Sequence, residues 1–138
     1  MELKNTAVLV TGGASGLGEA TAAHLAAQGA KVAVLDIQDE KAAAVAQRIG
    51  GIAVHCDVTD PASAENAIAK AREAHGVARI LVSCAGGAVG KRVVGKNGPM
   101  ALEDFTKVVT LTLFGSFNMT RLAAAEMIAA DPLGEERG

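Results

Sequence analysis

The sequence has no tryptophan, no tyrosine and only three phenylalanines, so aromatic residues make up 2% of its 138 residues. Proteins that bind single-stranded nucleic acid stack bases on aromatic side chains and attract phosphates with an excess of positive charge. This chain has neither feature, because its 13 Lys and Arg are outnumbered by 15 Asp and Glu, for a net charge of −2. We therefore expect no nucleic acid among its partners.

Cysteine and long apolar runs are also scarce. The two cysteines, Cys56 and Cys84, form no Cys-x-x-Cys pair and predict neither a disulfide scaffold nor a zinc site, which fits a reducing compartment. No apolar run approaches the roughly 18 residues that a membrane span needs. The first residues, Met1–Asn5, lack the basic and then apolar order of a signal peptide. We expect a cytoplasmic protein with no membrane partner.

Hydrophobic residues make up 50% of the chain, and they recur in short runs without polar alternation. Such runs are typical of strands that are covered on both faces. The runs are Ala7–Val10, Val32–Leu35, Ile52–Val54 and Ile80–Val82. Helical patterns lie between them, so the order of elements predicts an α/β fold with a doubly wound parallel sheet of about four strands.

Three apolar stripes at helical spacing separate these runs, and each indicates a helix with one buried face. The stripes are Leu17, Ala20, Thr21, His24 and Leu25; Ala42, Val45, Ala46 and Ile49; and Ala64, Ala67, Ile68 and Ala71. Gly29 and Gly50-Gly51 follow the first two helices, and Asp60-Pro61 opens the third as N-cap and first residue.

The last third of the chain follows a different pattern. Residues Ala88–Pro99 show no period and predict a loop, whereas Ala101–Ala130 predict a long helix that is apolar on two sides. The stripe expected to face the sheet comprises Leu113, Phe117, Thr120, Ala124, Met127 and Ile128. Leu111, Phe114 and Leu122 point elsewhere, so the second side predicts either another packed layer or a partner subunit.

The glycine-rich stretch after the first run, Thr11–Gly18, carries the first functional signal. Its spacing is Gly-x-x-x-Gly-x-Gly, with Gly12, Gly16 and Gly18 between a strand and a helix. The first N–H groups of a helix are unpaired, and its dipole favours an anion there, so this turn predicts a pyrophosphate site. A plain strand–helix turn is the alternative.

Asp36 ends the second run, 18 residues after Gly18, where an acidic residue meets the adenosine ribose in dinucleotide sites. A carboxylate there accepts hydrogen bonds from the 2′-hydroxyl and repels a 2′-phosphate, and no Lys or Arg lies in the glycine loop or directly after Asp36. The expected cofactor is therefore NAD rather than NADP. The alternative for Asp36 is a helix N-cap or a solvated turn residue.

Asp57-Val58 and Cys84-Ala85-Gly86 follow the third and fourth runs, and ligands of open α/β sheets bind at the carboxyl ends of strands. At this point the sequence resembles the short-chain dehydrogenase/reductase family, and most of all its type 2 3-hydroxyacyl-CoA dehydrogenase or hydroxysteroid branch. The matching stretches are Thr11–Gly18, Asp36, Asp57–Thr59, Cys84–Gly86, Leu102–Phe105 and Phe114–Asn118.

The resemblance implies a Rossmann-type fold and a role for each matching residue. Ser15 and Leu17 would line the pyrophosphate turn, and Asp36 would hold the ribose. The Asp57 carboxylate would meet the adenine amino group, and Val58 would contribute backbone. Cys84, Ala85 and Gly86 would carry the cofactor toward the nicotinamide. For Cys84 the alternative is a small packed thiol, and Cys56 is expected to be core.

The resemblance also implies hydride transfer between nicotinamide and a secondary alcohol or ketone, with a tyrosine, a lysine and a serine as catalytic residues. This chain contains no tyrosine and ends before the region where the family keeps that segment. Thr112 stands where the family usually has a proton-relay asparagine, and Ser83 replaces the first asparagine of Asn-Asn-Ala-Gly. We find no replacement catalytic group among the three histidines, which fall in no common motif.

Residues 1–138 are thus expected to form an NAD-binding domain that lacks the catalytic segment and is inactive alone. Its substrate would be a hydroxyacyl-CoA or hydroxysteroid, and Lys91, Arg92 and Lys96 either meet an acyl-CoA phosphate or are solvated loop charges. The complete protein would form a homo-oligomer through the Ala101–Ala130 helix. The competing hypothesis is a non-catalytic NAD-binding or subunit-interaction module; a nucleotide- or methyl-donor-binding enzyme of another type fits less well.

Overall fold

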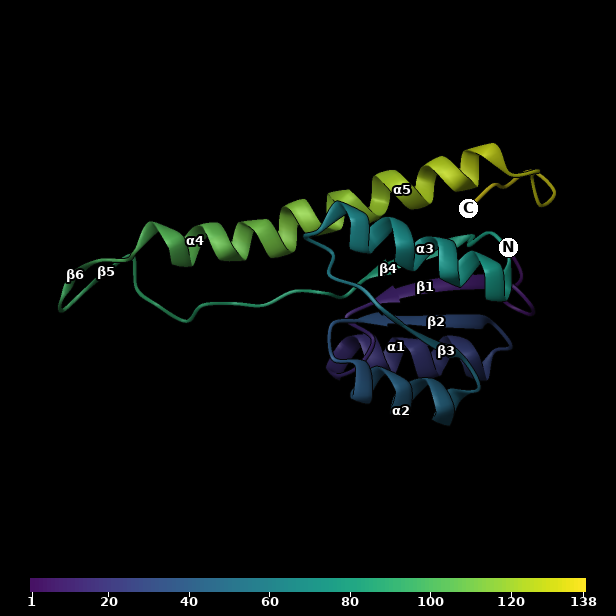
Figure 1. Ribbon diagram of the computed structural model, residues 1–138, viewed down its shortest axis with the longest axis horizontal. Coiled ribbons are helices and arrows are strands. Elements are labelled where there is room, and N and C mark those ends of the chain that lie inside the picture. The colour runs from purple at the N-terminus through teal and green to yellow at the C-terminus, as the bar shows by residue number, and fades with distance from the viewer.

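The computed structural model describes all 138 residues, Met1–Gly138, and its centre is a parallel four-stranded sheet (Figure 1). The strand order is β3-β2-β1-β4. The main elements are β1 (Ala7–Thr11), α1 (Gly16–Ala27), β2 (Lys31–Asp36), α2 (Asp39–Ile49), β3 (Ile52–His55), α3 (Pro61–His75), β4 (Ile80–Ser83), α4 (Leu102–Val109), η1 (Thr110–Phe114) and α5 (Gly115–Ala129). The predicted fold class and all four predicted strands are confirmed.

Helices cover both faces of the sheet. Helices α1 and α2 pack on one face around Val8, Val10 and Val34, whereas α3 and α5 pack on the other around Leu9 and Leu35. Successive residues of each central strand therefore contribute to opposite cores, which explains why the strand sequences do not alternate with polar residues. The chain moves outward from β1 through β2 to β3 and then returns to place β4 on the other side of β1.

The predicted buried faces of α2 and α3 are confirmed, but the stripe predicted for α1 is wrong. Leu17 is 83% exposed, and the buried residues of α1 are Gly18 and Ala22. Helix α1 is apolar on nearly every side, so its periodicity does not select one face. Gly18 selects it instead, because its Cα lies against the Gly12 carbonyl oxygen, where a Cβ has no room.

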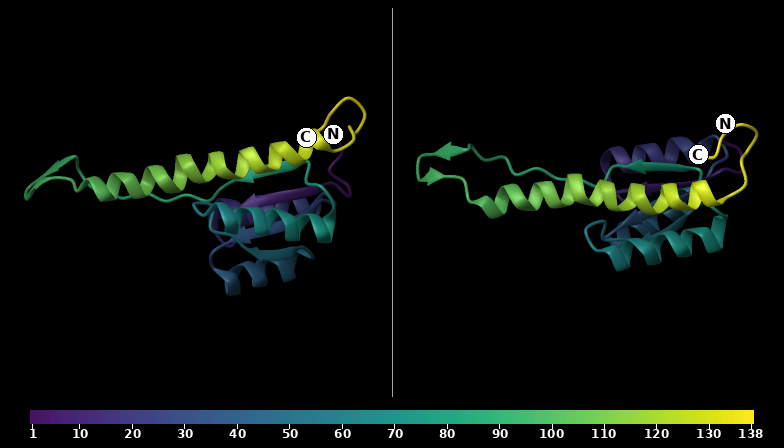
Figure 2. Two further views of the ribbon diagram at one scale, coloured as in Figure 1. Left: turned by 45° about the horizontal axis from the view of Figure 1, so that its top comes forward. Right: turned by 90° about the horizontal axis from the view of Figure 1, so that it is seen from above.

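The last helical stretch forms a continuous rod whose first part projects beyond the sheet as an arm (Figure 2). The rod comprises α4, the π-helical turn η1 and α5. The stripe predicted to face the sheet is wrong, since Leu113, Phe117 and Ile128 are 61–70% exposed. The buried residues of α5 are Gly115, Asn118, Met119 and Ala123, with Leu111, Leu122 and Met127 partly buried beside them. Because this buried face includes Gly115 and Asn118, which are not hydrophobic, the helical period of its apolar residues cannot be recognised in the sequence.

The segment Ala88–Pro99, predicted as a loop, contains a very short antiparallel hairpin at the tip of the arm. Strand β5 (Val94–Gly95) pairs with β6 (Gly98–Pro99). Strands of two residues are too short to leave a periodic pattern. Helix α4 begins directly after this hairpin, and Lys91 is anchored to it by an ion pair with Asp104, 2.5 Å between Nζ and Oδ2.

Candidate dinucleotide site

A cleft of about 370 Å³ opens at the carboxyl ends of the strands, next to the switch in strand order between the parallel strands β1 and β4. All residues that the sequence predicts for the cofactor line this cleft: Gly12, Ser15, Gly16, Leu17, Gly18, Asp36, Asp57, Val58, Cys84, Ala85 and Gly86. Open parallel sheets bind their ligands at this position, outside the strand ends and at the switch in strand order.

The glycine loop brings the N-terminus of α1 to the cleft. The first helical hydrogen bond runs from Glu19 N–H to the Ser15 carbonyl, 3.1 Å, so the N–H groups of Gly16, Leu17 and Gly18 precede it and lack helical partners. Ser15, the N-cap residue, makes no side-chain capping bond. Donors without partners at a helix N-terminus suit an anion such as a phosphate.

Glycine is required at the three positions of the motif for different physical reasons. Gly16 has φ +54° and open space where a Cβ would lie, so its site requires left-handed backbone and leaves room for a ligand. Gly12 has φ +64°, and a Cβ there would lie 2.7 Å from Ala85 N. Gly12 and Gly18 are thus needed for packing inside the protein, a role that the glycine spacing alone does not indicate.

Asp36 is buried, 7% exposed, and both of its carboxylate oxygens accept a backbone hydrogen bond. Oδ2 accepts from Ala14 N–H and Oδ1 from Gln38 N–H, each at 3.0 Å. A carboxylate has about four lone-pair positions, so each oxygen keeps one for a further donor. The bond to Gln38 is a local turn contact, but Asp36 is buried rather than solvated, and the N-cap of α2 is Gln38, so the structure supports neither form of the alternative interpretation.

Asp57 presents one carboxylate oxygen to the protein and leaves the other free. Its Oδ1 accepts from the hydroxyl of Thr59 at 2.7 Å and from Thr59 N–H at 2.9 Å. These bonds, the hydroxyl first, lower the pKa of Asp57 below its ordinary value of 3.8, with a smaller contribution from the charge of His55. Asp57 is therefore an anion at neutral pH with Oδ2 available to accept a hydrogen bond.

Strand β4 closes the other side of the cleft. Ala85 N–H donates to the Thr11 hydroxyl oxygen at 3.2 Å, and Cys84 N–H donates to the Thr11 carbonyl at 3.1 Å, so the ends of β1 and β4 are tied together. Cys84 is partly exposed in the cleft. Cys56 is buried, as predicted, and burial raises the pKa of its thiol to about 12.

Four residues of the cleft were not assigned to the site from the sequence: Ile37, Gln38, Cys56 and Leu111. Ile37 and Gln38 directly follow Asp36, and their position after a strand end was a usable signal. Leu111 lies in η1, more than 50 residues further along the chain than Asp57. Nothing in the local sequence indicates that it reaches the cleft, because only the packing of α5 places it there.

No helix of the chain is both long enough and apolar enough to cross a membrane. A glycine turn before a helix, a buried acid at the end of β2 and a cleft at the switch in strand order are features of an α/β domain of Rossmann type. The model of the family described as short chain dehydrogenase matches residues 6–135. The chain belongs to the short-chain dehydrogenase family.

Its relatives include 3-hydroxyacyl-CoA dehydrogenases. The chain is 40% identical to the 3-hydroxyacyl-CoA dehydrogenase type-2 of Drosophila melanogaster over 94% of this chain and 52% of the relative, and 38% identical to that of Homo sapiens over 99% and 54%. The crystal structure of 3-hydroxyacyl-CoA dehydrogenase type-2 from Mycobacterium avium superimposes with a TM-score of 0.89 at 38% identity, over 97% of this chain and 54% of that one. The chain thus spans about half the length of these relatives.

Proposed function

We propose that this chain is the NAD-binding part of a short-chain oxidoreductase that acts on a 3-hydroxyacyl-CoA-like secondary alcohol or its ketone. The observation that carries the proposal is the convergence of the glycine turn, Asp36, Asp57-Val58 and Cys84–Gly86 on one cleft. The N–H groups at the start of α1 would hold the pyrophosphate, the Asp36 carboxylate the adenosine ribose, and Asp57 the adenine amino group. The bound nicotinamide would supply or accept the hydride.

The residues fit NAD better than NADP. The remaining lone pairs of Asp36 suit two ribose hydroxyls, whereas its negative charge, buried and close to the site of a 2′-phosphate, opposes a phosphate group. The flanking Ile37 and Gln38 carry no positive charge to offset this repulsion.

The chain has no tyrosine, so it does not contain the acid/base group that the family uses, and we propose that it binds the cofactor without turning over substrate. Titration calorimetry with NAD⁺ tests the binding. We expect saturable heat and an increase in Tm with NAD⁺ concentration, because a ligand of the native state stabilises it. A cooperatively folded sample that shows neither would refute the proposal, and NADH production by the pure chain would refute the inactivity.

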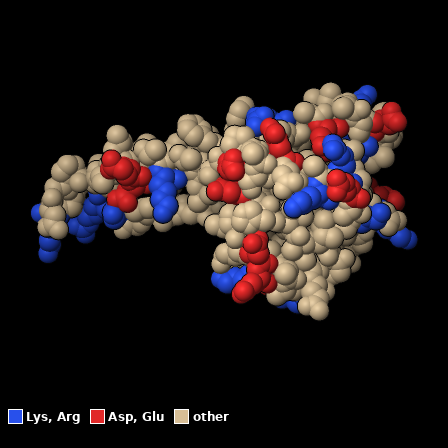
Figure 3. All heavy atoms as spheres, in the orientation of Figure 1, with Lys and Arg blue, Asp and Glu red and all other residues tan.

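The hydroxyacyl-CoA class is supported by the relatives and by the charge at the tip of the arm. Lysine and arginine gather there in Figure 3, and the residues are Lys91, Arg92 and Lys96. Lys91 is paired with Asp104, which leaves Arg92 and Lys96 for the phosphates of a coenzyme A. Charge reversal at both should weaken coenzyme A binding and leave NAD⁺ binding unchanged, whereas solvated loop charges would change neither.

The rod also supports assembly of two copies. Its large exposed apolar residues are Leu102, Phe105, Leu113, Phe114, Phe117 and Ile128. Aromatic and aliphatic side chains exposed along one element are typical of a subunit interface. We propose that a second copy of the chain covers this surface. A non-catalytic NAD-binding module would share the cleft and the interface, and a test of activity in a chain extended to the length of its relatives separates the two hypotheses.

A further inference from the structure

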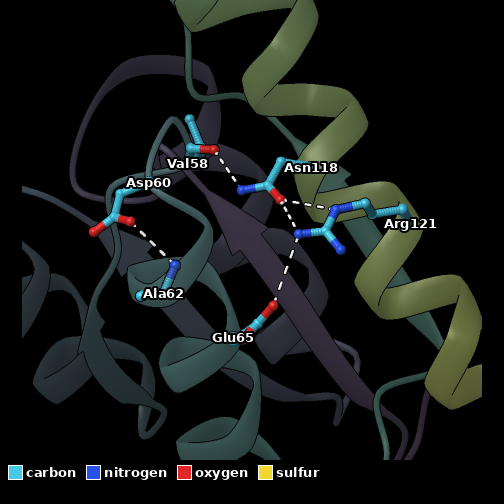
Figure 4. A network of polar contacts seen from close by, with 6 residues as sticks. All are labelled: Val58, Asp60, Ala62, Glu65, Asn118 and Arg121. Carbon is cyan, nitrogen blue, oxygen red and sulfur yellow. Dashed lines mark hydrogen bonds and ion pairs between the residues drawn. The ribbon is translucent and has the colours of Figure 1, made fainter.

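The adenine end of the cleft is built against the middle of α5, through contacts that the cofactor motif does not include. Val58 lines the cleft and is buried. Its carbonyl accepts a hydrogen bond from the side-chain Nδ2 of Asn118 at 2.9 Å, across 60 residues of chain (Figure 4). Asn118 is itself only 8% exposed.

Two neighbours of Asn118 on the same helix face strengthen this contact. A Cβ on Gly115 would lie 2.5 Å from Cγ2 of Val58, so the helix backbone touches the Val58 side chain directly. Met119 is fully buried, and its sulfur lies 3.8 Å from the sulfur of Cys56. Gly115, Asn118 and Met119 on one face of α5 therefore contact the segment Cys56–Val58 that follows β3. These contacts fix the position of Val58 in the cleft.

The orientation of the Asn118 amide is also determined. Its Oδ1 accepts two hydrogen bonds from Arg121, from Nε at 3.0 Å and from Nη2 at 2.8 Å. Arginine only donates, so the amide oxygen must face Arg121 and the amide NH₂ must face Val58. Arg121 in turn lies 3.8 Å from Glu65 on α3, at the exposed end of the network in Figure 4.

The other end of the same segment is fixed by α3. The Asp60 side chain accepts from Ala62 N–H at 3.1 Å and caps that helix. The carbonyl of Val58 accepts the bond from Asn118, but no hydrogen bond within the chain uses the Val58 N–H. This N–H has no partner within the chain and belongs to a residue that lines the cleft, so an acceptor atom of a ligand there would gain a hydrogen bond.

We infer that Asn118 is a positioning residue for the base of the dinucleotide, acting through the Val58 backbone and kept in orientation by Arg121. The inference rests on the proposed function, since it requires NAD in this cleft. The Val58 N–H would donate to N1 of the adenine while Asp57 accepts from its amino group. Loss of the amide donor would let the Val58 backbone shift and would weaken this recognition of the base edge.

The test compares two dinucleotides on the 138-residue chain. Nicotinamide hypoxanthine dinucleotide has the same phosphates and sugars as NAD⁺, but its N1 carries a proton and cannot accept from Val58. Asn118→Asp keeps the size of the side chain and its bonds to Arg121 but places an acceptor against the Val58 carbonyl. We expect the Kd for NAD⁺ to rise about tenfold, as for the loss of one buried hydrogen bond, and that for the hypoxanthine analogue to change much less.

Two further variants complete the test. Asn66→Asp makes the same chemical change on the exposed side of α3 and should alter neither affinity. Arg121→Met keeps the Asn118 donor but removes what orients it, and its side chain is 41% exposed, so the variant should fold. We expect it to weaken NAD⁺ binding about threefold, again with little effect on the analogue.

The outcomes separate the two proposals. A wild-type chain that binds neither dinucleotide overturns the proposed function and this inference with it. A wild-type chain that binds NAD⁺, with an Asn118→Asp variant that binds both ligands normally or loses both equally, overturns the inference alone. If Asn118→Asp fails to melt cooperatively, Arg121→Met decides, and unchanged discrimination between the dinucleotides in that variant overturns the inference.

Discussion

The Asp36 carboxylate and the Ala14 N–H, 22 residues apart in the chain, form a buried hydrogen bond of 3.0 Å. The residue proposed to bind the ribose is therefore also the residue that ties the glycine loop to the end of β2. A substitution at Asp36 has two separable effects, one on the choice of cofactor and one on stability.

Replacing Asp36 by Ala together with Ile37 by Arg should shift preference from NAD⁺ toward NADP⁺, because it removes the repelling carboxylate and supplies a cation for the 2′-phosphate. The free energy of unfolding should fall by about 1–3 kcal/mol, because Ala14 N–H loses a buried acceptor. Kd values for both cofactors and a urea melt check these effects. Ile37→Arg alone, with Asp36 in place, is the control and should still favour NAD⁺; equal relative affinities in all three proteins would contradict the ribose role.

Thr59→Val should reduce the loss of thermal stability that occurs when the pH is lowered from neutral into the acid range. The hydrogen bonds from Thr59 lower the pKa of Asp57 in the folded state, so their contribution is fully present above the unfolded pKa of about 4 and is lost as pH falls through the lowered folded value. The difference in Tm between wild type and variant should therefore be largest near neutral pH and narrow toward about pH 3. A difference that is constant or grows in acid contradicts this assignment.

The two cysteines should differ in reactivity. Cys56 is 3% exposed with a pKa near 12, so almost none of it is thiolate at pH 8, whereas Cys84 is partly exposed in the cleft. Iodoacetamide should modify one thiol per native chain, at Cys84, and both after unfolding in urea, as mass spectrometry would show. NAD⁺ should slow the modification of Cys84. Native labelling of a Cys84→Ala variant at the wild-type rate would show that this assignment is wrong.

Phe117→Ser should weaken self-association, because it removes a large apolar side chain, 66% exposed, from the proposed contact between two rods. Sedimentation velocity over a range of concentrations would measure the effect as a shift toward monomer. Val94→Ser, which alters an equally exposed apolar residue on the hairpin, is the matched control and should leave the assembly unchanged. A wild-type chain that is monomeric at about 100 μM, well above the Kd of a stable interface, would rule out this contact.

The sequence predicted the strands and the fold class, and the eleven residues it proposed for the cofactor all line one cleft, because each of these depended on local patterns. An apolar run without alternation, a glycine turn and an acid at a strand end retain their meaning without knowledge of distant residues. The faces of α2 and α3 were predictable for the same reason, since polar residues on one side of each helix leave only one face to bury.

The faces of α1 and α5 were not predictable, because a backbone contact rather than hydrophobicity selects them. In α1 the close approach of Gly18 to the Gly12 carbonyl decides which face is buried. In α5 the contact of Gly115 with Val58 and the bond from Asn118 decide it, and they leave Phe117 outside. Leu111 enters the cleft for the same reason, so the missed site residue and the wrong stripe have one cause.

The π-helical turn η1 determines the direction in which the side chains of α4 point relative to α5. A π turn contains one residue more than the α-helical turn that it replaces, and each residue advances a helix by about 100°. Deleting a single residue within Thr110–Phe114 would therefore rotate Leu102 and Phe105 by about 100° around the rod axis, whereas Gly115 and Asn118 would keep their contacts with Val58. Chains that differ by one residue at this joint would therefore present the exposed side chains of α4 in a different direction while α5 keeps its contacts with Val58.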